Sequence, residues 1–176
     1  MAICNHSIIV LGLGNDILGD DAVGLLIARE LKKQIENSSI DVTETALAGF
    51  ELLDMLQGYD KALILDAVVT KKHPPGTVLE LSAEQFKHAT AVSPHYGGLP
   101  EVLKLAEKLQ IKFPTDIRIL AVEIEPPYQL REGLSSVIHN SISDIIKRAK
   151  EIIHDWDAQQ QTCSLQNLRS DCIEIP

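Results

Sequence analysis

The sequence predicts an α/β protein, a three-layer α/β/α sandwich around a twisted and mostly parallel sheet of about five strands. Two observations lead to this fold class. Short apolar runs typical of buried strands alternate along the chain with segments of helical periodicity. The core is expected to be aliphatic, because apolar residues make up 45% of the 176 residues and aromatic residues only 4%. Such a core suits a parallel sheet that helices cover on both faces.

Five segments have the character of strands. The runs at residues 7–12 and 61–69 are nearly continuous in apolar residues, which is typical of buried central strands. Residues 78–81 follow a Pro-Pro-Gly turn, and this predicts an edge strand. Two further strands are predicted at residues 41–46 and 117–125.

Four segments are predicted to be helices, at residues 20–36, 49–58, 99–109 and 134–156. In the first, the apolar residues fall on one stripe, and Lys32 and Lys33 lie near the C-terminal end, where the helix dipole favours positive charge. The second is short and is closed by Gly58. In the last, leucine and isoleucine recur at intervals of three and four, and Ser135 is placed to cap the start.

The chain is expected to form one domain. Residues 1–156 are enough for a hydrophobic core of their own. The hydrophobic periodicity stops after Trp156, and residues 157–176 are polar and rich in glutamine. We expect this C-terminal tail to be mobile or to act as an arm that depends on a partner.

Composition and charge exclude several classes of protein. A net charge of −9 argues against a nucleic-acid partner, because phosphate binding depends on clusters of Lys and Arg. No run of about 18 apolar residues could span a membrane, and the N-terminus lacks the features of a secretory signal. The three cysteines form no C-x-x-C, so we interpret them as free thiols of a cytoplasmic protein, with a Cys163–Cys172 disulfide as the alternative. We expect a monomer.

Polar side chains follow three of the predicted strands at the point where each strand ends. A Gly-rich loop with Asp16, Asp20 and Asp21 follows the first strand. Asp66 lies late in the apolar run at residues 61–69, and His95 lies in a Pro/Gly-rich loop before a helix. Ligands collect at the carboxyl ends of the strands in such folds. Two carboxylates and one imidazole at that edge are a ligand set for a divalent ion such as nickel or zinc.

Each of these side chains also has a structural interpretation. Asp20 or Asp21 could cap the first helix. A hydrogen bond to a neighbouring loop could satisfy Asp66, although a carboxylate in a buried strand is costly unless it is paired or binds a metal. His95 could be an ordinary loop histidine. The spacing does not decide between these alternatives, because the residues are far apart in the sequence.

The glycines of the first loop do not make a nucleotide site. Gly12 and Gly14 begin a G-x-G-x-x-G pattern, but its last position is Ile17, and no Walker lysine follows. The aspartates of the loop would also repel a pyrophosphate at the start of the helix. A nucleotide-binding domain is therefore the weakest of the alternatives.

Five segments in a fixed order carry a family resemblance. They are GLGNDILGDDAVG at 12–24, LAGFELL at 47–53, LILDAV at 63–68, SPHYGGL at 93–99 and EPPYQLREGLS at 125–135. They resemble the opening motif, the Gly-rich turn and second helix, the aspartate-bearing strand, the Ser-Pro-His loop and the Pro-containing segment of the nickel–iron hydrogenase maturation proteases. The resemblance covers nearly the whole predicted domain and leaves the tail without an assignment.

The resemblance implies a site and a reaction. In that family an acidic residue of the first loop, the strand aspartate and the loop histidine bind the metal, and here they match Asp21, Asp66 and His95. The implied activity is that of a metal-dependent peptidase, which removes the C-terminal extension from a nickel-loaded precursor of a hydrogenase large subunit. The substrate would supply the nickel, and no organic cofactor is expected. Asp20 remains the candidate helix cap, and Asp16 is expected at the surface.

Two other functions stay open on the sequence alone. A non-enzymatic nickel-binding chaperone of hydrogenase assembly would use the same three ligands but would leave the length of the precursor unchanged. A spore-type aspartate-dependent protease on a similar fold would need no metal and should cut the metal-free substrate. A serine protease is a poor interpretation because the chain contains no G-x-S-x-G, and no H-E-x-x-H is present either.

Overall fold

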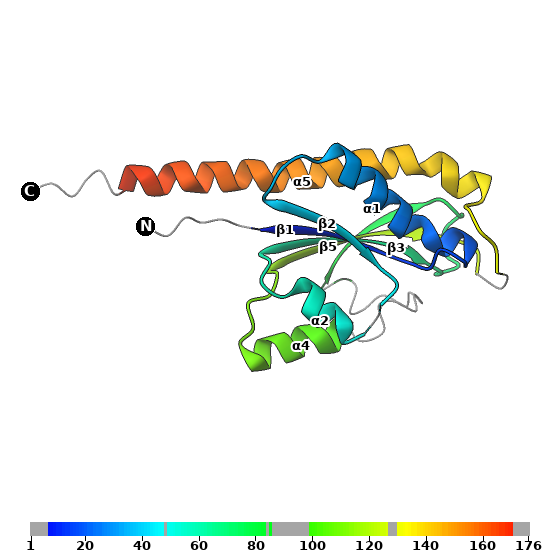
Figure 1. Ribbon diagram of the computed structural model, residues 1–176, viewed down its shortest axis with the longest axis horizontal. Coiled ribbons are helices and arrows are strands. Elements are labelled where there is room, and N and C mark those ends of the chain that lie inside the picture. Colours follow the sequence, from blue (N-terminus) through cyan, green and yellow to red (C-terminus); the bar gives the residue numbers. More distant parts are fainter. Residues whose placement is uncertain (1–6, 48, 84, 86–98, 127–129, 171–176) are drawn as a thin grey trace, which may run out of the picture.

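The computed structural model describes residues 7–47, 49–83, 85, 99–126 and 130–170 (Figure 1). The strands are β1 (Ile8–Leu13), β2 (Ile40–Thr45), β3 (Lys61–Val68), β4 (Val78–Ser82) and β5 (Asp116–Glu123). The helices are the 3₁₀ turn η1 (Gly19–Ala22), α1 (Val23–Gln34), α2 (Glu51–Leu56), α4 (Leu99–Leu109) and α5 (Ser136–Ser170).

The five strands form one mixed sheet in the order β2-β1-β3-β5-β4. The first four of these strands run parallel, and β4 pairs antiparallel with β5 at the edge. The predicted mostly parallel sheet is confirmed, and so is the position of residues 78–81 at an edge. Because β1 and β3 lie inside the sheet and are covered on both faces, their side chains are buried along almost their whole length.

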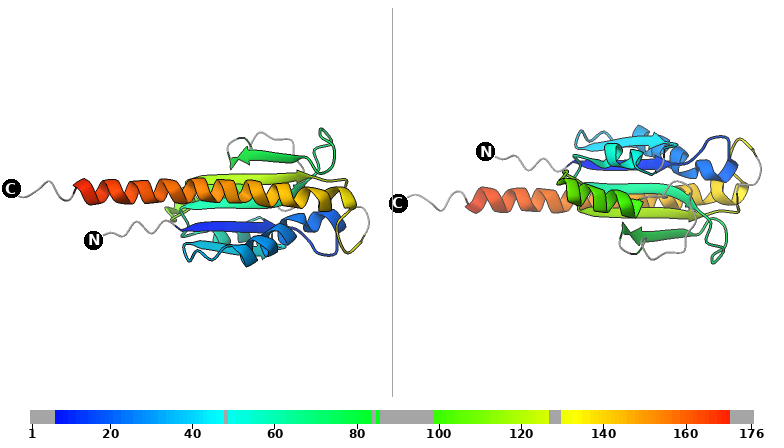
Figure 2. Two further views of the ribbon diagram at one scale, coloured as in Figure 1. Left: turned by 90° about the horizontal axis from the view of Figure 1, so that it is seen from above. Right: turned by 90° about the horizontal axis from the view of Figure 1, so that it is seen from below.

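Helices cover both faces of the sheet. Figure 2 shows α1 and α5 in front of one face and α2 and α4 in front of the other. Alternate residues of a strand point to opposite faces, and β3 follows this rule: Leu63 and Leu65 belong to the core beneath α1 and α5, whereas Ala62 and Ile64 belong to the core beneath α2. Asp66 has the same parity as Ala62 and Ile64, so it belongs to the face that α2 and α4 cover.

The largest differences from the predicted helix limits are at the start of the first helix and at the end of the last. A 3₁₀ turn precedes α1, which therefore begins at Val23. α5 does not end at Trp156 but continues to Ser170 (Figure 1). Alanine and glutamine after Trp156 are good helix formers, so the helix continues where the apolar periodicity stops. The mobility of residues 157–176 stays a prediction. The predicted cap of α5 is confirmed, because the Ile138 N–H donates to Ser135 Oγ at 3.4 Å.

Trp156 fastens α5 to the amino ends of β3 and β5. Its side chain is fully buried, and Nε1–H donates to Asp116 Oδ2 at 2.7 Å. The Lys61 ammonium lies 5.6 Å and the Arg118 guanidinium 5.3 Å from the centre of the indole ring. At such distances the face of an indole ring attracts a cation electrostatically. Burial lowers the pKa of Lys61, an effect that nearby Asp116 opposes.

Among the described helices, none combines the length and apolar character needed to cross a membrane.

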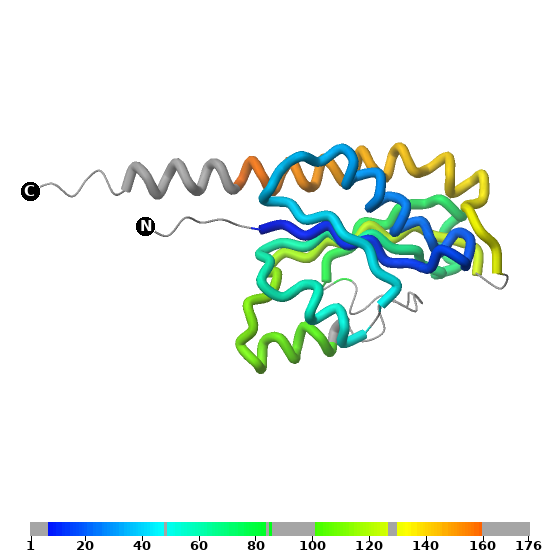
Figure 3. Tube along the Cα trace, in the orientation of Figure 1, coloured from blue at the N-terminus to red at the C-terminus, as the bar shows by residue number. Residues whose placement is uncertain are grey.

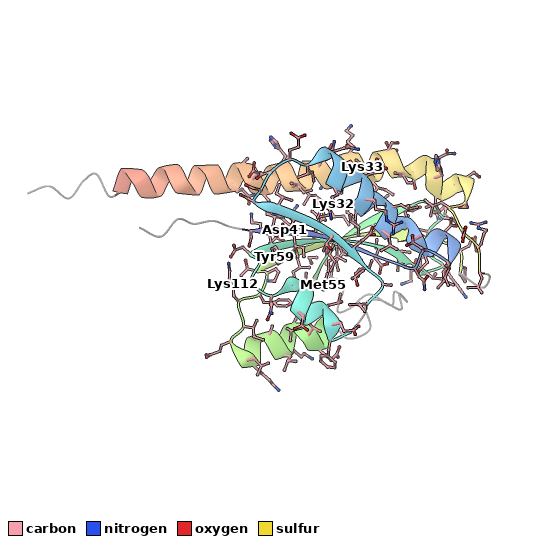
Figure 4. The ribbon with its side chains drawn as sticks, in the orientation of Figure 1. Lys32, Lys33, Asp41, Met55, Tyr59 and Lys112 are labelled. Carbon is pink, nitrogen blue, oxygen red and sulfur yellow. The ribbon has the colours of Figure 1, made fainter. Side chains whose placement is uncertain are left out.

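Tyr59 should titrate unusually late. Burial and its hydrogen bond to Asp41 Oδ2, at 2.8 Å, raise the pKa of Tyr59 to about 12 (Figure 4). The phenol of an unfolded chain ionises near 10, so the unfolded chain loses a proton first and stability should fall as the pH rises from about 10 to about 12. Absorbance titration of the wild type against Tyr59→Phe would check this, and a phenol at Tyr59 with an ordinary pKa would contradict it.

Candidate functional site

The candidate site lies at the edge of the sheet where β1, β3 and β5 end. The strands are parallel, so Leu13, Val68 and Glu123 all finish at this edge. Two glycines, Gly12 and Gly24, bring α1 close to the strand ends. A Cβ on Gly24 would lie 2.3 Å from the carbonyl oxygens of both Leu13 and Leu65. A Cβ on Gly12 would lie 2.4 Å from the carbonyl oxygen of Gly24. Only glycine permits so close an approach.

Asp21 and Asp66 are brought to this edge from different elements. Asp21 lies in η1, which contacts β3, and Asp66 directly follows Leu65 in β3. Both are buried, with 2% and 0% of their surface exposed. Burial of a carboxylate is costly unless hydrogen bonds, a cation or a metal compensate it. For Asp66 one such bond is the Ala67 N–H, which donates to Oδ1 at 2.7 Å.

The third predicted ligand, His95, lies outside the described residues. Within the part of the chain that the structure describes, no group of three His, Cys, Asp or Glu side chains could hold a metal ion. The three-ligand set therefore stays a prediction. α4 begins at Leu99, shortly after His95 in the sequence, and lies on the face to which Asp66 belongs.

Asp20 does not cap the first helix, and this prediction is wrong. Neither η1 nor α1 has a side-chain cap. The Asp20 carboxylate instead accepts a hydrogen bond from the Ser135 N–H at 2.5 Å and one from Arg131 Nη2 at 3.4 Å. The sequence could not reveal this, because both donors come from a segment more than a hundred positions away.

The other polar residues of the loop have local roles. Asp16 is exposed, as predicted, and forms a bidentate pair with Arg29 at 2.8 and 2.7 Å. These hydrogen bonds lower the pKa of the Asp16 carboxyl. Asn15 stabilises the turn, since its Oδ1 accepts the Ile17 N–H at 3.2 Å and its carbonyl accepts the Leu18 N–H at 3.1 Å.

Glu123 is a buried carboxylate that the sequence analysis missed. It ends β5 beside Val68 and is 1% exposed. Its carboxylate accepts hydrogen bonds from the Thr70 N–H at 2.7 Å, the Lys71 N–H at 2.9 Å and the Thr70 hydroxyl. Lys71 has a φ of 60°, a left-handed conformation that costs about 1–3 kcal/mol in a residue other than glycine. Glu123 thus holds the turn that directly follows the Asp66-bearing strand. Its signal was the same as that of Asp66, a single acid late in an apolar run.

Replacing Glu123 with alanine should destabilise the protein by about 2–4 kcal/mol, because the donors of Thr70 and Lys71 lose their acceptor. Urea unfolding followed by the fluorescence of Trp156 would measure the change in the free energy of unfolding. Glu125→Ala is the control, since Glu125 lies on the same segment but is exposed. Equal stability of the two variants would show that Glu123 does not hold the turn.

Four exposed hydrophobic side chains lie in segments that follow strands at this edge. Ile17 follows β1, Leu47 and Phe50 follow β2, and Leu130 follows β5, with exposed fractions between 45% and 76%. Ile17 and Leu130 are close together, because the Arg131 N–H donates to the Ile17 carbonyl at 3.0 Å. Exposed apolar side chains at one edge of a sheet are a feature expected of a surface that binds another protein. We call these four residues the apolar rim.

Comparison with known proteins gives one consistent result. A family model described as hydrogenase maturation protease (HycI) matches residues 25–152, a range that includes Asp66 and His95 and begins after Asp21. The hydrogenase 2 maturation protease of Escherichia coli K12 is 31% identical over 150 residues, which are 82% of this chain and 91% of that protein.

Solved structures agree with this match. The hydrogenase maturating endopeptidase HybD from Escherichia coli superposes with a TM-score of 0.75 at 29% identity, covering 85% of this chain and 93% of that one. The [NiFe] hydrogenase maturation protease HybD from Thermococcus kodakarensis gives a TM-score of 0.67 at 25% identity, covering 83% and 98% of the two chains.

Proposed function

Because the chain belongs to the hydrogenase maturation protease family, and is therefore a hydrolase, we propose that it removes the C-terminal extension from a nickel-loaded precursor of a nickel–iron hydrogenase large subunit. The observation that carries this proposal is the pair of buried carboxylates, Asp21 and Asp66, on two contacting elements at the carboxyl edge of a parallel sheet. Such a pair is suited to a cation brought by the substrate, and it would repel an anionic ligand.

The chemistry follows from the residue types. Asp21, Asp66 and His95 would engage the nickel of the precursor with two carboxylate oxygens and one imidazole nitrogen, a ligand set suited to this ion. Engaged in this way, the metal of the substrate would polarise the scissile carbonyl or lower the pKa of a bound water. One of the two carboxylates would take the proton of that water. Selectivity has a direct explanation, since a precursor without nickel would bring no metal for these ligands and would leave the active site incomplete.

The apolar rim supports a protein as the substrate. A short free peptide would need only a narrow groove, whereas the rim residues are exposed and come from segments after β1, β2 and β5, at the edge of the sheet where these parallel strands end. A folded precursor could cover the rim while its C-terminal segment reaches the site.

The mass of the precursor before and after incubation with the protein tests the proposal. A nickel-loaded precursor should lose its C-terminal extension, and the same precursor without nickel should keep its full mass. If the nickel-loaded chain keeps its length while nickel moves between the proteins, the chain is a chaperone instead. Cleavage of the metal-free precursor at the same rate would reject the role of nickel.

A further inference from the structure

We infer that Asp20 is a positioning residue for its neighbour Asp21, because it ties the loop that carries Asp21 to the segment that leads into α5. This inference rests on the proposed function in one respect, since it takes Asp21 to be the group that acts on the substrate. The tie is formed by Asp20, Arg131 and Ser135, and we call these residues and their contacts the loop latch. Figure 3 shows the two tied segments side by side at one end of the molecule, the blue loop after β1 and the yellow segment before α5.

The side-chain part of the latch is a largely buried carboxylate with two donors. The Asp20 side chain is only 13% exposed. Its Oδ1 accepts the Ser135 N–H at 2.5 Å and Arg131 Nη2 at 3.4 Å. A hydrogen bond from a backbone N–H to a carboxylate is charge-assisted and about twice as strong as a neutral one. Because the Ser135 N–H belongs to the residue that caps α5, the bond connects the first loop to the start of a helix packed on the core.

The backbone part of the latch reinforces the same contact. The Gly19 N–H donates to the Arg131 carbonyl at 2.6 Å, and the Arg131 N–H donates to the Ile17 carbonyl at 3.0 Å. Leu18 and Arg131 form an isolated parallel bridge. Gly19 has a φ of +59°, and a Cβ there would lie 3.4 Å from Arg131 Nε, so the guanidinium packs over a residue without a side chain.

The latch contacts η1 on the outer side of the turn, which faces away from the sheet. On the inner side, a Cβ on Gly14 would lie 2.2 Å from the Asp21 carbonyl oxygen, so β1 supports the turn closely there. Within the turn itself, the Asp21 N–H donates to the Leu18 carbonyl at 3.3 Å, which is a long and weak bond. No side chain caps η1. Asp20 therefore adds a short side-chain contact to the backbone hydrogen bonds that hold the turn, and this contact orients the backbone from which Asp21 projects.

Amide hydrogen exchange measured by NMR tests the latch without any substrate. Asp20→Ala should speed the exchange of the Gly19, Asp21 and Ser135 amides by about tenfold or more, while the sheet amides of β3 stay unchanged. Asp20→Asn keeps an acceptor for the Ser135 N–H, so its exchange rates should stay within about threefold of the wild type. Asp16→Asn, in the same loop but exposed, is the matched control and should change none of these amides. Unchanged exchange at Asp21 in Asp20→Ala would overturn the latch.

Kinetics of precursor processing test the positioning. Asp20→Ala should lower kcat by roughly 10–100-fold, because a displacement of about 1 Å at a reacting group has an effect of this size. The KM should stay within about threefold, since the apolar rim is untouched, and Asp20→Asn should recover most of kcat. A wild-type kcat in Asp20→Ala, or a change in KM alone, would reject the positioning role.

The two proposals fail in different ways. If neither the wild type nor Asp16→Asn processes the nickel-loaded precursor, the proposed function is wrong, and the exchange rates still decide the latch. If both process it and Asp20→Ala does so equally well, only the positioning role is wrong. Arg131→Ala covers the case in which Asp20→Ala fails to fold. Its side chain is 54% exposed, and its removal should lower kcat by about threefold through the weaker, longer contact.

Discussion

Replacing Asp66 with alanine is expected to lower kcat/KM for a nickel-loaded precursor by at least about a thousandfold, a loss typical of removing one member of a catalytic set that acts as a unit. Asp66 is the fully buried carboxylate of the proposed site and lies on β3, which packs on both neighbours along its length. The strand fixes the position of Asp66 at the carboxyl edge of the sheet.

The fold should survive this substitution. Alanine removes a buried carboxylate, and the substitution breaks the hydrogen bond that the Ala67 N–H donates to it. Circular dichroism should show the wild-type spectrum, and mass spectrometry of the precursor should show no truncated product. Asp116→Asn is the control, because Asp116 lies at the opposite end of β5, its side chain is 40% exposed, and asparagine keeps an oxygen that can accept the Trp156 Nε1–H. Normal processing by Asp66→Ala would remove Asp66 from the site.

Replacing Gly24 with alanine is expected to destabilise the protein by at least about 4 kcal/mol, near the upper end of what single substitutions do. The added Cβ would lie 2.3 Å from two backbone oxygens, those of Leu13 and Leu65, on adjacent strands. Neither oxygen belongs to a flexible side chain, so α1 as a whole would have to move away from the sheet. That movement would also displace Asp21, which lies two residues before the start of α1.

Gly58→Ala is the matched control for this substitution. No atom lies within 4 Å of a Cβ on Gly58, but its φ of +88° strains any other residue, so we expect a loss of about 1 kcal/mol. Urea unfolding monitored by Trp156, the single tryptophan of the chain, would report both variants. Similar stability of the Gly24 and Gly58 variants would mean that the helix and the sheet can separate at little cost.

The sequence predicted those parts of the fold that depend on local pattern. The apolar runs at β1 and β3 located the central strands, and the Pro-Pro-Gly turn before β4 located an edge. The limits of α4 were predicted as Leu99 and Leu109, where the structure places them. Asp66 was found because one acid in a buried strand is unusual, and the same argument applied to Glu123 would have found that residue too.

The sequence could not predict contacts that depend on distant partners. Asp20 is adjacent to a helix start, so a cap was the expected role, yet its donors lie in the segment at Arg131 and Ser135. Likewise, the 3₁₀ turn before α1 lies where Gly14 and Gly24 permit a close approach of backbone segments, a tertiary contact that local helix propensity does not encode. The sequence places the end of α5 too early because the apolar periodicity stops at Trp156, whereas helix propensity alone continues the helix to Ser170.

The sheet order has a consequence for synthesis on the ribosome. β5 is the last strand to be made, yet it lies between β3 and β4 and is the strand on which β4 pairs. A nascent chain that has not reached Asp116 therefore exposes one edge of the apolar strand β3 and leaves β4 unpaired. Open strand edges of this kind invite aggregation, so the emerging chain should depend on chaperone binding until β5 is inserted.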